Sequence, residues 1–360
     1  MKKHILTIAA LLGSTCAAQA GGIDRSGQSI AALFEAGRYV EFSLGSISPS
    51  TSGVGTVFSG TPGANSGDIT PSYLQFGAAY KADINEQLSY AIIYDQPFGA
   101  DIAYPAGSGY VAQGSTADLK AHAITGLLRY KLPSNVSFHG GVRVQSIEAT
   151  AAVPFVGGYT VDGQRDTGVG YVAGVAYERP DIALRVSLTY SSKIKHDVAT
   201  TEFGVLQTTT EIETPQSVNL EFQTGIAADT LLFGGVRWVD WSSFDITPDN
   251  YPPGALVSYE NDVFTYSLGV GRRLNENWSV SASIGYEKSN GGFASNLGPT
   301  DGNKSLALAA IYTRDNMKVT TGIRYVNIGD AQTTLNGVNA ASNFNDNDAV
   351  AIGVKVGYTF

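Results

Sequence analysis

The sequence predicts an all-β fold, a 14-stranded antiparallel transmembrane β-barrel with a short N-terminal plug. Composition is the first reason: only 15% of the 360 residues are charged and 42 are glycine, whereas soluble domains usually have about 25% charged residues. The second reason is a regular alternation of apolar with small or polar residues. The third is that short and long connections alternate between these segments, as they do in outer-membrane barrels. No apolar run reaches the length of about 18 residues that a membrane-spanning helix needs.

The first twenty residues have the pattern of an export signal. Met1–Lys3 is basic, Ile5–Leu12 is apolar, and Ala18–Ala20 forms a small-x-small cleavage site. The alternative, a buried N-terminal helix, does not account for the basic flank together with the cleavage site. We therefore assign residues 1–20 to a signal peptide and expect the mature chain to begin at Gly21. Cys16 is the only cysteine, so the mature chain needs no disulfide.

The next segment, residues 21–36, lacks alternation and precedes the first strand. Ser26 is a candidate N-cap for a short helix with Ile30, Leu33 and Phe34 on one side. Because the first strand rises from the periplasm, this segment begins at the periplasmic mouth of the barrel. A lumen enclosed by fourteen strands is too wide to fill with its own side chains. We expect residues 21–36 to form a plug, or hatch, in that lumen; the alternative is a disordered periplasmic tail.

Residues 37–360 form the predicted barrel, and each strand has one apolar face. The apolar faces begin and end in aromatic residues, as lipid-facing strands do at the two membrane interfaces. The last strand illustrates the pattern, with Val350, Ile352, Val354, Val356, Tyr358 and Phe360 on one face. The fourteen predicted strands lie at about 37–47, 72–81, 87–96, 117–131, 135–149, 163–178, 181–195, 214–227, 229–243, 262–273, 277–289, 303–314, 316–328 and 347–360.

The connections assign the two ends of the barrel. Every second one is short, and we place these in the periplasm; the others are long, and we place them outside the cell. Closure of the sheet pairs the edges that an open sheet would expose in the membrane. The short connections are at 82–86, 132–134, 179–180, 228, 274–276 and 315, and long ones include 48–71, 97–116, 244–261 and 329–346.

The chain resembles the outer-membrane fatty-acid and hydrocarbon transporter family (FadL/TodX). The resemblance rests on the strand number, the N-terminal segment GGIDRSGQSIAALFEAG, the block from Thr214 to Ser242 that contains RWVDWS, and the terminal Phe360. The Asn-Pro-Ala element of the family's longer hatch is absent. The resemblance implies passive uptake of hydrophobic compounds, such as long-chain fatty acids or aromatic hydrocarbons, across the outer membrane of a Gram-negative bacterium. It also implies no cofactor, and release sideways through the wall at a kink in the third strand.

The third predicted strand ends at Pro97-Phe98-Gly99. Proline cannot donate a hydrogen bond to a β-ladder, so pairing is expected to be lost here. Pro97, Phe98 and Gly99 either mark a lateral opening in the wall or only begin the second extracellular loop.

Ligand contacts are predicted from the inward face of the strands. Apolar residues stand there on the ninth predicted strand together with an arginine, which suits a hydrophobic tunnel. Inward arginines 129, 143, 185, 237 and 324 match a carboxylate head group, but for most of them we favour pairing with inward acids such as Glu41 and Glu221 or with Asp24 and Glu35 of the plug. The predicted ligand-binding set is Ile30, Leu33, Phe34, Arg143, Arg185, Leu231, Phe233, Arg237 and Trp241.

Other functional classes have less support. The predicted mature chain has 21 basic and 32 acidic residues, a poor balance for binding nucleic acid. His122 falls on the lipid face and His196 in a predicted loop, which leaves His139 as the one lumenal histidine; we expect neither an enzyme nor a metal site. The expected partners are hydrophobic small molecules, outer-membrane lipid and lipopolysaccharide, with the chain as a monomer. The alternative function is a general porin or a surface adhesin or receptor barrel.

Overall fold

The structure is a computed structural model that describes residues 22–252 and 254–360; the predicted signal peptide lies outside these residues. A closed wall of fourteen antiparallel strands forms the barrel, three of them interrupted. In wall order these strands are β1 (Tyr39–Ser50), β3 (Tyr73–Asp83), β4 (Leu88–Asp95) with β5 (Gly99–Ala103), β6 (Thr116–Lys131), β7 (Val136–Val153), β8 (Tyr159–Arg179), β9 (Leu184–Ser191) with β10 (Ile194–Glu202), β11 (Leu206–Thr214) with β12 (Ser217–Ala227), β13 (Thr230–Val239), β16 (Val263–Arg273), β17 (Trp278–Glu287), β19 (Asn303–Arg314), β20 (Met317–Ile328) and β23 (Asn347–Thr359).

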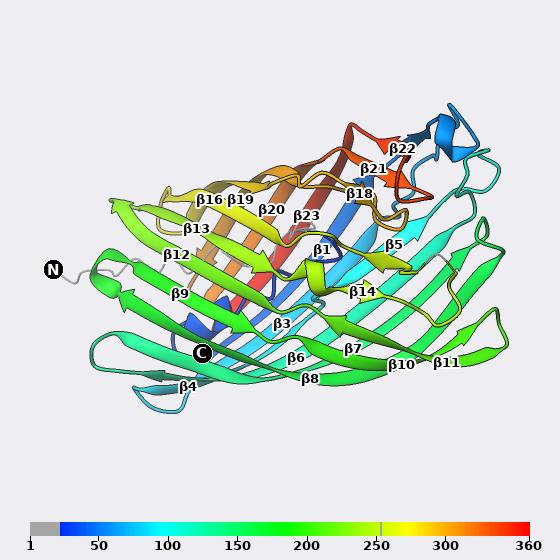
Figure 1. The fold of residues 1–360 in the computed structure, drawn as a ribbon. Coiled ribbons are helices and arrows are strands. Elements are labelled where there is room, and N and C mark those ends of the chain that lie inside the picture. The colour runs from blue at the N-terminus through cyan, green and yellow to red at the C-terminus, as the bar shows by residue number, and fades with distance from the viewer. Residues whose placement is uncertain (1–21, 253) are drawn as a thin grey trace.

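The barrel closes where the last strand pairs with the first. Tyr39 of β1 lies opposite Thr359 of β23, and the ladder continues to Ser50 opposite Asp348. Short turns join the strands at one end and long loops join them at the other (Figure 1). The predicted all-β, 14-stranded barrel is therefore confirmed.

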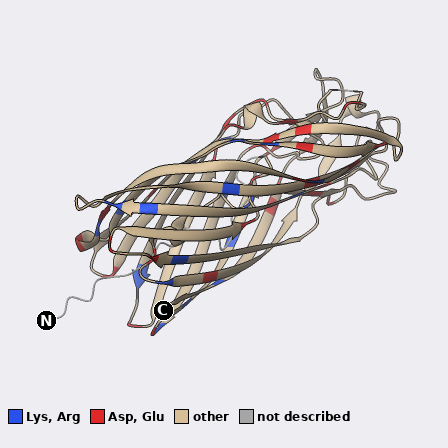
Figure 2. Ribbon diagram, turned by 90° about the horizontal axis from the view of Figure 1, so that it is seen from below, with Lys and Arg blue, Asp and Glu red and all other residues tan. Residues whose placement is uncertain are grey.

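The two faces of the wall differ in chemistry as the alternation predicts. Outward-facing side chains are large, apolar and exposed; Val169 is 65% exposed and Ile284 is 59% exposed. A hydrocarbon environment accounts for such a surface, because exposed apolar patches of this extent are rare on soluble monomers. Charged residues are sparse along the ribbon (Figure 2). No helix among the described residues has the length and apolar character to cross a membrane.

The loops at the long-loop end pack into a cap with its own sheet and core. The sheet consists of β18 (Phe293–Ala294), β21 (Ala331–Thr334), β22 (Ala340–Phe344) and β2 (Gly53–Gly55). Its core includes Phe344 and Tyr110, both at most 1% exposed. Burial raises the pKa of the Tyr104 hydroxyl well above its usual value, so this group stays neutral and donates to the Asn296 carbonyl at 2.6 Å.

The remaining short elements lie around the same barrel. They are the 3-10 helices η1 (Ala31–Phe34), η2 (Val57–Ser59), η3 (Pro180–Ile182) and η4 (Trp241–Ser243), and the strands β14 (Asp245–Ile246) and β15 (Val257–Ser258). Strand β14 pairs with β11 and β15, so the segment after β13 stays close to the wall.

One predicted loop is in fact a hairpin. Residues 196–213 continue the wall as β10 and β11, which pair from Ile194 opposite Thr214 to Glu202 opposite Leu206. Apolar alternation stops there because the outward face carries Lys195, which pairs with Glu211 at 2.6 Å; beyond the lipid, this face has no need of apolar side chains. The prediction that His196 lies in a loop is therefore also wrong. His196 is fully buried and lies 3.2 Å from the Gln145 amide, so it faces inward as His139 does.

Candidate functional site

The N-terminal segment, residues 22–36, lies inside the barrel (Figure 1) and is held there by polar contacts to several strands. Arg237 of β13 donates to the carboxylate of Asp24 at 2.6 Å, and Ser26 donates to Asp95 of β4 at 2.6 Å. Asn219 of β12 donates to the Gly27 carbonyl at 2.9 Å. Asp24 is only 1% exposed. These contacts come from opposite sides of the lumen, so they fix the position of the segment across it.

Apolar packing anchors the other half of this segment. Ile30 is 2% exposed and Leu33 is fully buried, and both lie in a cluster with Ala91, Leu127 and other inward residues of the wall. The helix in this half is the single 3-10 turn η1, whose N-cap is Ile30. The predicted N-cap, Ser26, was therefore wrong: its hydroxyl lies ahead of this turn, where it donates to Asp95 and accepts from the backbone N–H of Gln28.

The predicted inward arginines mostly contact the N-terminal segment. Arg143 donates to Gln28 at 2.5 Å, and Arg237 donates to Asp24. The guanidinium groups of Arg129 and Arg185 lie 4.7 Å and 4.6 Å from the centroid of the Phe34 ring. A cation over an aromatic face is attracted by its quadrupole, so these arginines hold Phe34 in place. Arg129 also pairs with Glu178.

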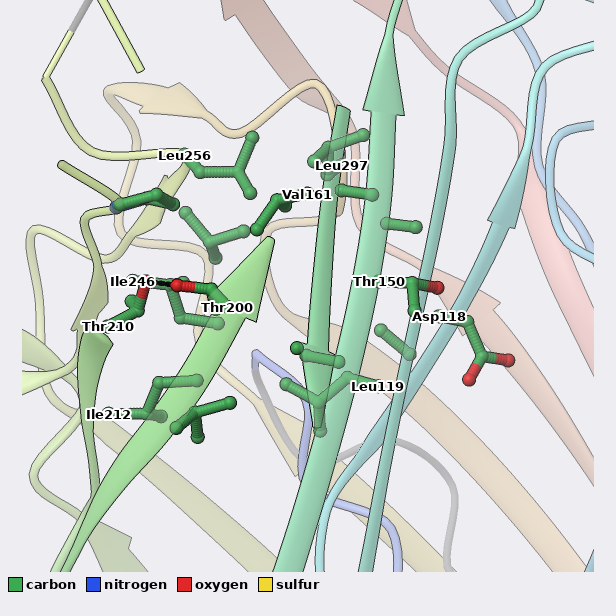
Figure 3. A pocket seen from close by; sticks show the side chains of 18 of the residues that line it. Asp118, Leu119, Thr150, Val161, Thr200, Thr210, Ile212, Ile246, Leu256 and Leu297 are labelled. Atoms are coloured by element: carbon green, nitrogen blue, oxygen red, sulfur yellow. Dashed lines mark hydrogen bonds between the residues drawn. The ribbon is translucent and has the colours of Figure 1, made fainter. Parts of the chain in front are cut away.

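An apolar cavity lies above this segment, on the side of the long loops (Figure 3). Its cavity volume is about 50 Å³, and it is partly open to solvent. Ile23 of the N-terminal segment contributes to its lining. The wall and the segment after β13 supply most of the rest, including Leu119, Ala149, Ile212, Ile246 and Leu256. Concave, mostly apolar sites of this kind bind hydrophobic small molecules.

The predicted ligand-binding residues do not line this cavity. Trp241 is fully buried, with its ring 5.8 Å from that of Phe98 and 5.4 Å from that of Phe244, and Phe244 does line the cavity. Leu231 and Phe233 are buried inward residues of β13. Ile30, Leu33 and Phe34 belong to the separate cluster described above.

Sequence reasoning missed most of the true lining residues. Leu119 carried a usable signal, because it is a large apolar residue on the inward face of a strand, the same anomaly that singled out Phe233. Ile212 and Ile246 gave no such signal, because one fell in a predicted loop and the other in the long connection 244–261.

The wall loses pairing at the predicted position in the third strand. Strand β4 pairs with β3 only as far as Tyr94 opposite Ala78, and β5, which starts at Gly99, pairs with β6. Among the described residues, Tyr73–Gly77 of β3 therefore has a ladder partner only in β1. The amide of Phe76 is satisfied by the side chain of Gln96 at 2.7 Å.

The N-terminal segment takes up the backbone groups that the third strand leaves free. Arg25 donates its backbone N–H to the Pro97 carbonyl at 2.8 Å, and Gly99 donates to the Ile23 carbonyl at 2.9 Å. Phe98 is only 2% exposed. A second, smaller cavity of about 40 Å³ lies at this gap between the segment and the wall, lined by Ser26, Ala32, Ser43, Gln75, Tyr94 and others.

Comparison with protein families finds one that covers most of the chain. Residues 34–360 match the model of the outer membrane protein transport protein family (OMPP1/FadL/TodX). No curated protein matches the chain.

Solved structures with a similar fold come from three bacteria. A FadL homologue of Pseudomonas aeruginosa is 12% identical, with 92% of each chain covered and a TM-score of 0.75. The toluene transporter TodX of Pseudomonas putida is 12% identical over 91% of each chain, with a TM-score of 0.66. The toluene transporter TbuX of Ralstonia pickettii is 13% identical over 91% of this chain and 90% of its own, with a TM-score of 0.64.

Proposed function

The chain belongs to the outer membrane protein transport family (OMPP1/FadL/TodX), and we propose that it carries hydrophobic compounds, such as long-chain fatty acids or aromatic hydrocarbons, passively across the outer membrane. The apolar cavity is the observation that carries this proposal. An amphiphile that crosses the polar lipopolysaccharide layer needs an apolar path, because the free energy of its hydrocarbon part falls when that part leaves water for apolar surroundings. Two relatives of known structure are named as toluene transporters, which supports the aromatic branch of this substrate class.

In this proposal, residues 21–36 are the plug below the cavity. The buried ion pair of Asp24 with Arg237 and the buried Ile30 and Leu33 support this role, because they hold the described part of the segment across the lumen. A hydrophilic solute that enters from outside then meets apolar walls and an occupied lumen. This favours a selective transporter over a general porin or an adhesin.

The release step of the proposal uses the gap beside Pro97. Two observations support it: the β3–β4 ladder of the described residues ends at Ala78 opposite Tyr94, so that Tyr73–Gly77 pairs with β1 alone, and a cavity lies at this place. A hydrophobic compound released here enters lipid directly and avoids the aqueous periplasm. The lost pairing costs little, because the N-terminal segment and Gln96 satisfy backbone groups at the gap.

Uptake by whole cells tests the function. Deletion of the gene is expected to lower uptake of long-chain fatty acids, alkanes or small aromatics and to leave uptake of a hydrophilic sugar unchanged. Plasmid-borne wild type restores the uptake. If all hydrophobic compounds enter the deletion strain normally while sugar uptake is lost, the chain is a general porin and the proposal is wrong.

The apolar anchor of the plug provides a prediction of its own. Replacing Ile30, Leu33 and Phe34 together by alanine is expected to alter uptake of hydrophobic compounds more than uptake of a sugar. Each buried aliphatic residue that is truncated to alanine costs about 2–5 kcal/mol, so the segment loses most of its apolar hold. Radiolabelled uptake of both solute classes measures the effect, and equal changes for both count against a lumen controlled by this segment.

A further inference from the structure

We propose that the ion pair between Arg25 and Asp101 holds the lateral gap closed, and we call this ion pair the bolt. The Arg25 side chain passes from the N-terminal segment into the wall and pairs with Asp101 on the outer side of β5. The inference rests on the proposed lateral release and adds the residue that controls it. Loss of this ion pair frees the gap, and movement of residues 23–25 breaks it.

The register of β5 shows on which side Arg25 lies. Gly99 is opposite Lys120 and Asp101 is opposite Asp118, and the side chains of Lys120 and Asp118 are 51% and 36% exposed on the outer face. Residues directly opposite in a sheet point to the same face, so Gly99 and Asp101 face outward. A Cβ atom on Gly99 would lie 2.6 Å from the Arg25 guanidinium carbon. The guanidinium therefore occupies the outer side of β5.

The surroundings of the guanidinium place it between two separated strands. It lies 3.8 Å from the centroid of the Tyr73 ring of β3, and its Nη2 donates to Asp101 at 2.8 Å. Arg25 is 7% exposed. The Tyr73 ring packs against the inward residues Ile47 and Ala351, so the guanidinium lies between an inward ring of β3 and the outward carboxylate of β5.

The contacts of Arg25 make the bolt releasable. Its Nε is buried without a hydrogen-bond partner among the described residues. Its guanidinium forms an ion pair with Asp101, whose side chain is 25% exposed. A buried charge with a single ionic partner depends strongly on that partner. Gly99 is needed here because any larger residue would displace the guanidinium.

The same segment links the gap to the apolar cavity. Ile23 lines that cavity, and its carbonyl accepts the hydrogen bond from Gly99. Two residues further on, Arg25 holds the gap closed. A hydrophobic compound that fills the cavity contacts Ile23, so displacement of Ile23 withdraws Arg25 from Asp101 and opens the wall.

Chemical labelling from the lipid tests the bolt in the mature chain. Ala32 lines the cavity at the gap and is 4% exposed, and the predicted mature chain has no cysteine, so Ala32→Cys is a single reporter. In purified protein in phospholipid vesicles, pyrenyl maleimide dissolved in the bilayer is expected to label this cysteine slowly. Adding Asp101→Asn raises the rate about tenfold or more, within the usual range for coupling between two sites.

The matched control is Glu148→Gln, the same loss of a carboxylate charge on the outer face of the neighbouring strand β7. Glu148 pairs with Arg165 at 3.0 Å and does not line the cavity, so labelling stays slow. Arg25→Met and Gly99→Ala must each raise the rate as Asp101→Asn does, and heat-modified mobility on gels shows that each barrel is folded. Equal rates in Asp101→Asn, Arg25→Met and wild type overturn the bolt.

Uptake of a fatty acid and of toluene, measured on the same variants in cells, separates the bolt from the proposed function. Fast labelling with no hydrophobic uptake even by wild type supports the bolt and contradicts the function. Normal uptake with slow labelling in every variant supports the function and contradicts the bolt.

Discussion

Filling the apolar cavity by Ala149→Trp is expected to lower uptake of hydrophobic compounds about tenfold or more while the barrel still folds. Ala149 faces inward from β7 and lines the cavity with Leu119 and Ile212. An indole ring occupies space that a ligand needs; such overpacking typically costs about 1–3 kcal/mol, which leaves the barrel folded. Initial rates of radiolabelled fatty-acid and toluene uptake in the deletion strain measure the loss.

The control for this change is Ala199→Trp in β10. Ala199 is exposed and is absent from the cavity lining, so the same gain in size leaves uptake unchanged. Equal uptake by wild type and Ala149→Trp, with equal amounts of folded protein in the membrane, would show that hydrophobic compounds do not pass through this cavity.

Arg237→Met is expected to have the second large effect, on both stability and closure of the lumen. It leaves the Asp24 carboxylate, 1% exposed, without its cation, and removal of one partner of a buried ion pair costs about 3–5 kcal/mol. Arg237 also donates to Asn219 at 2.8 Å. Urea unfolding in lipid vesicles measures the free energy lost, and single-channel conductance reports a lumen that has opened.

The double variant Asp24→Asn with Arg237→Met is the control for the charge. A neutral amide then replaces the buried carboxylate, so the double variant regains a large part of the free energy of unfolding that Arg237→Met loses. A double-mutant cycle separates this coupling from the cost of each change. If Arg237→Met and the double variant are equally unstable, the ion pair contributes nothing and the segment is held by packing alone.

The fold was predictable because a membrane demands apolar residues on one face of every strand. All fourteen predicted strands correspond to strands of the wall, with boundaries such as 303–314 matching β19 and others shifted by a few residues. The alternation fails as a guide once the wall rises beyond lipid. There the outward face of β10 and β11 is charged, and Asp197 and Glu211 replace the apolar residues that mark lower parts of the wall.

The candidate site was only partly predictable from sequence. The alternation of inward and outward residues predicted that Arg143 and Arg237 face the lumen, and in the structure both contact the N-terminal segment. The cavity depends on residues far apart in the chain that come together in the fold, such as Ile23, Leu119 and Leu297. The alternation of inward and outward residues along one strand cannot predict which segments meet. The position of Arg25 depends on a gap between two strands, which Pro97 signals only as a local break.

The central claim is that hydrophobic compounds pass from the apolar cavity to the wall gap under control of the N-terminal segment. Its most direct measurement is uptake by Ser26→Cys/Asp95→Cys, a pair whose native side chains are 2.6 Å apart. Uptake is measured before and after the two cysteines are joined by a short reducible thiol crosslinker. The control pair, Thr201→Cys/Gln207→Cys, joins native side chains whose polar atoms lie 3.0 Å apart within the hairpin of β10 and β11, and neither residue lines the cavity. We predict that crosslinking Ser26→Cys to Asp95→Cys stops uptake of fatty acid and toluene, that reduction restores it, and that the control pair transports in both states. Undiminished uptake by the crosslinked Ser26→Cys/Asp95→Cys protein would contradict this claim.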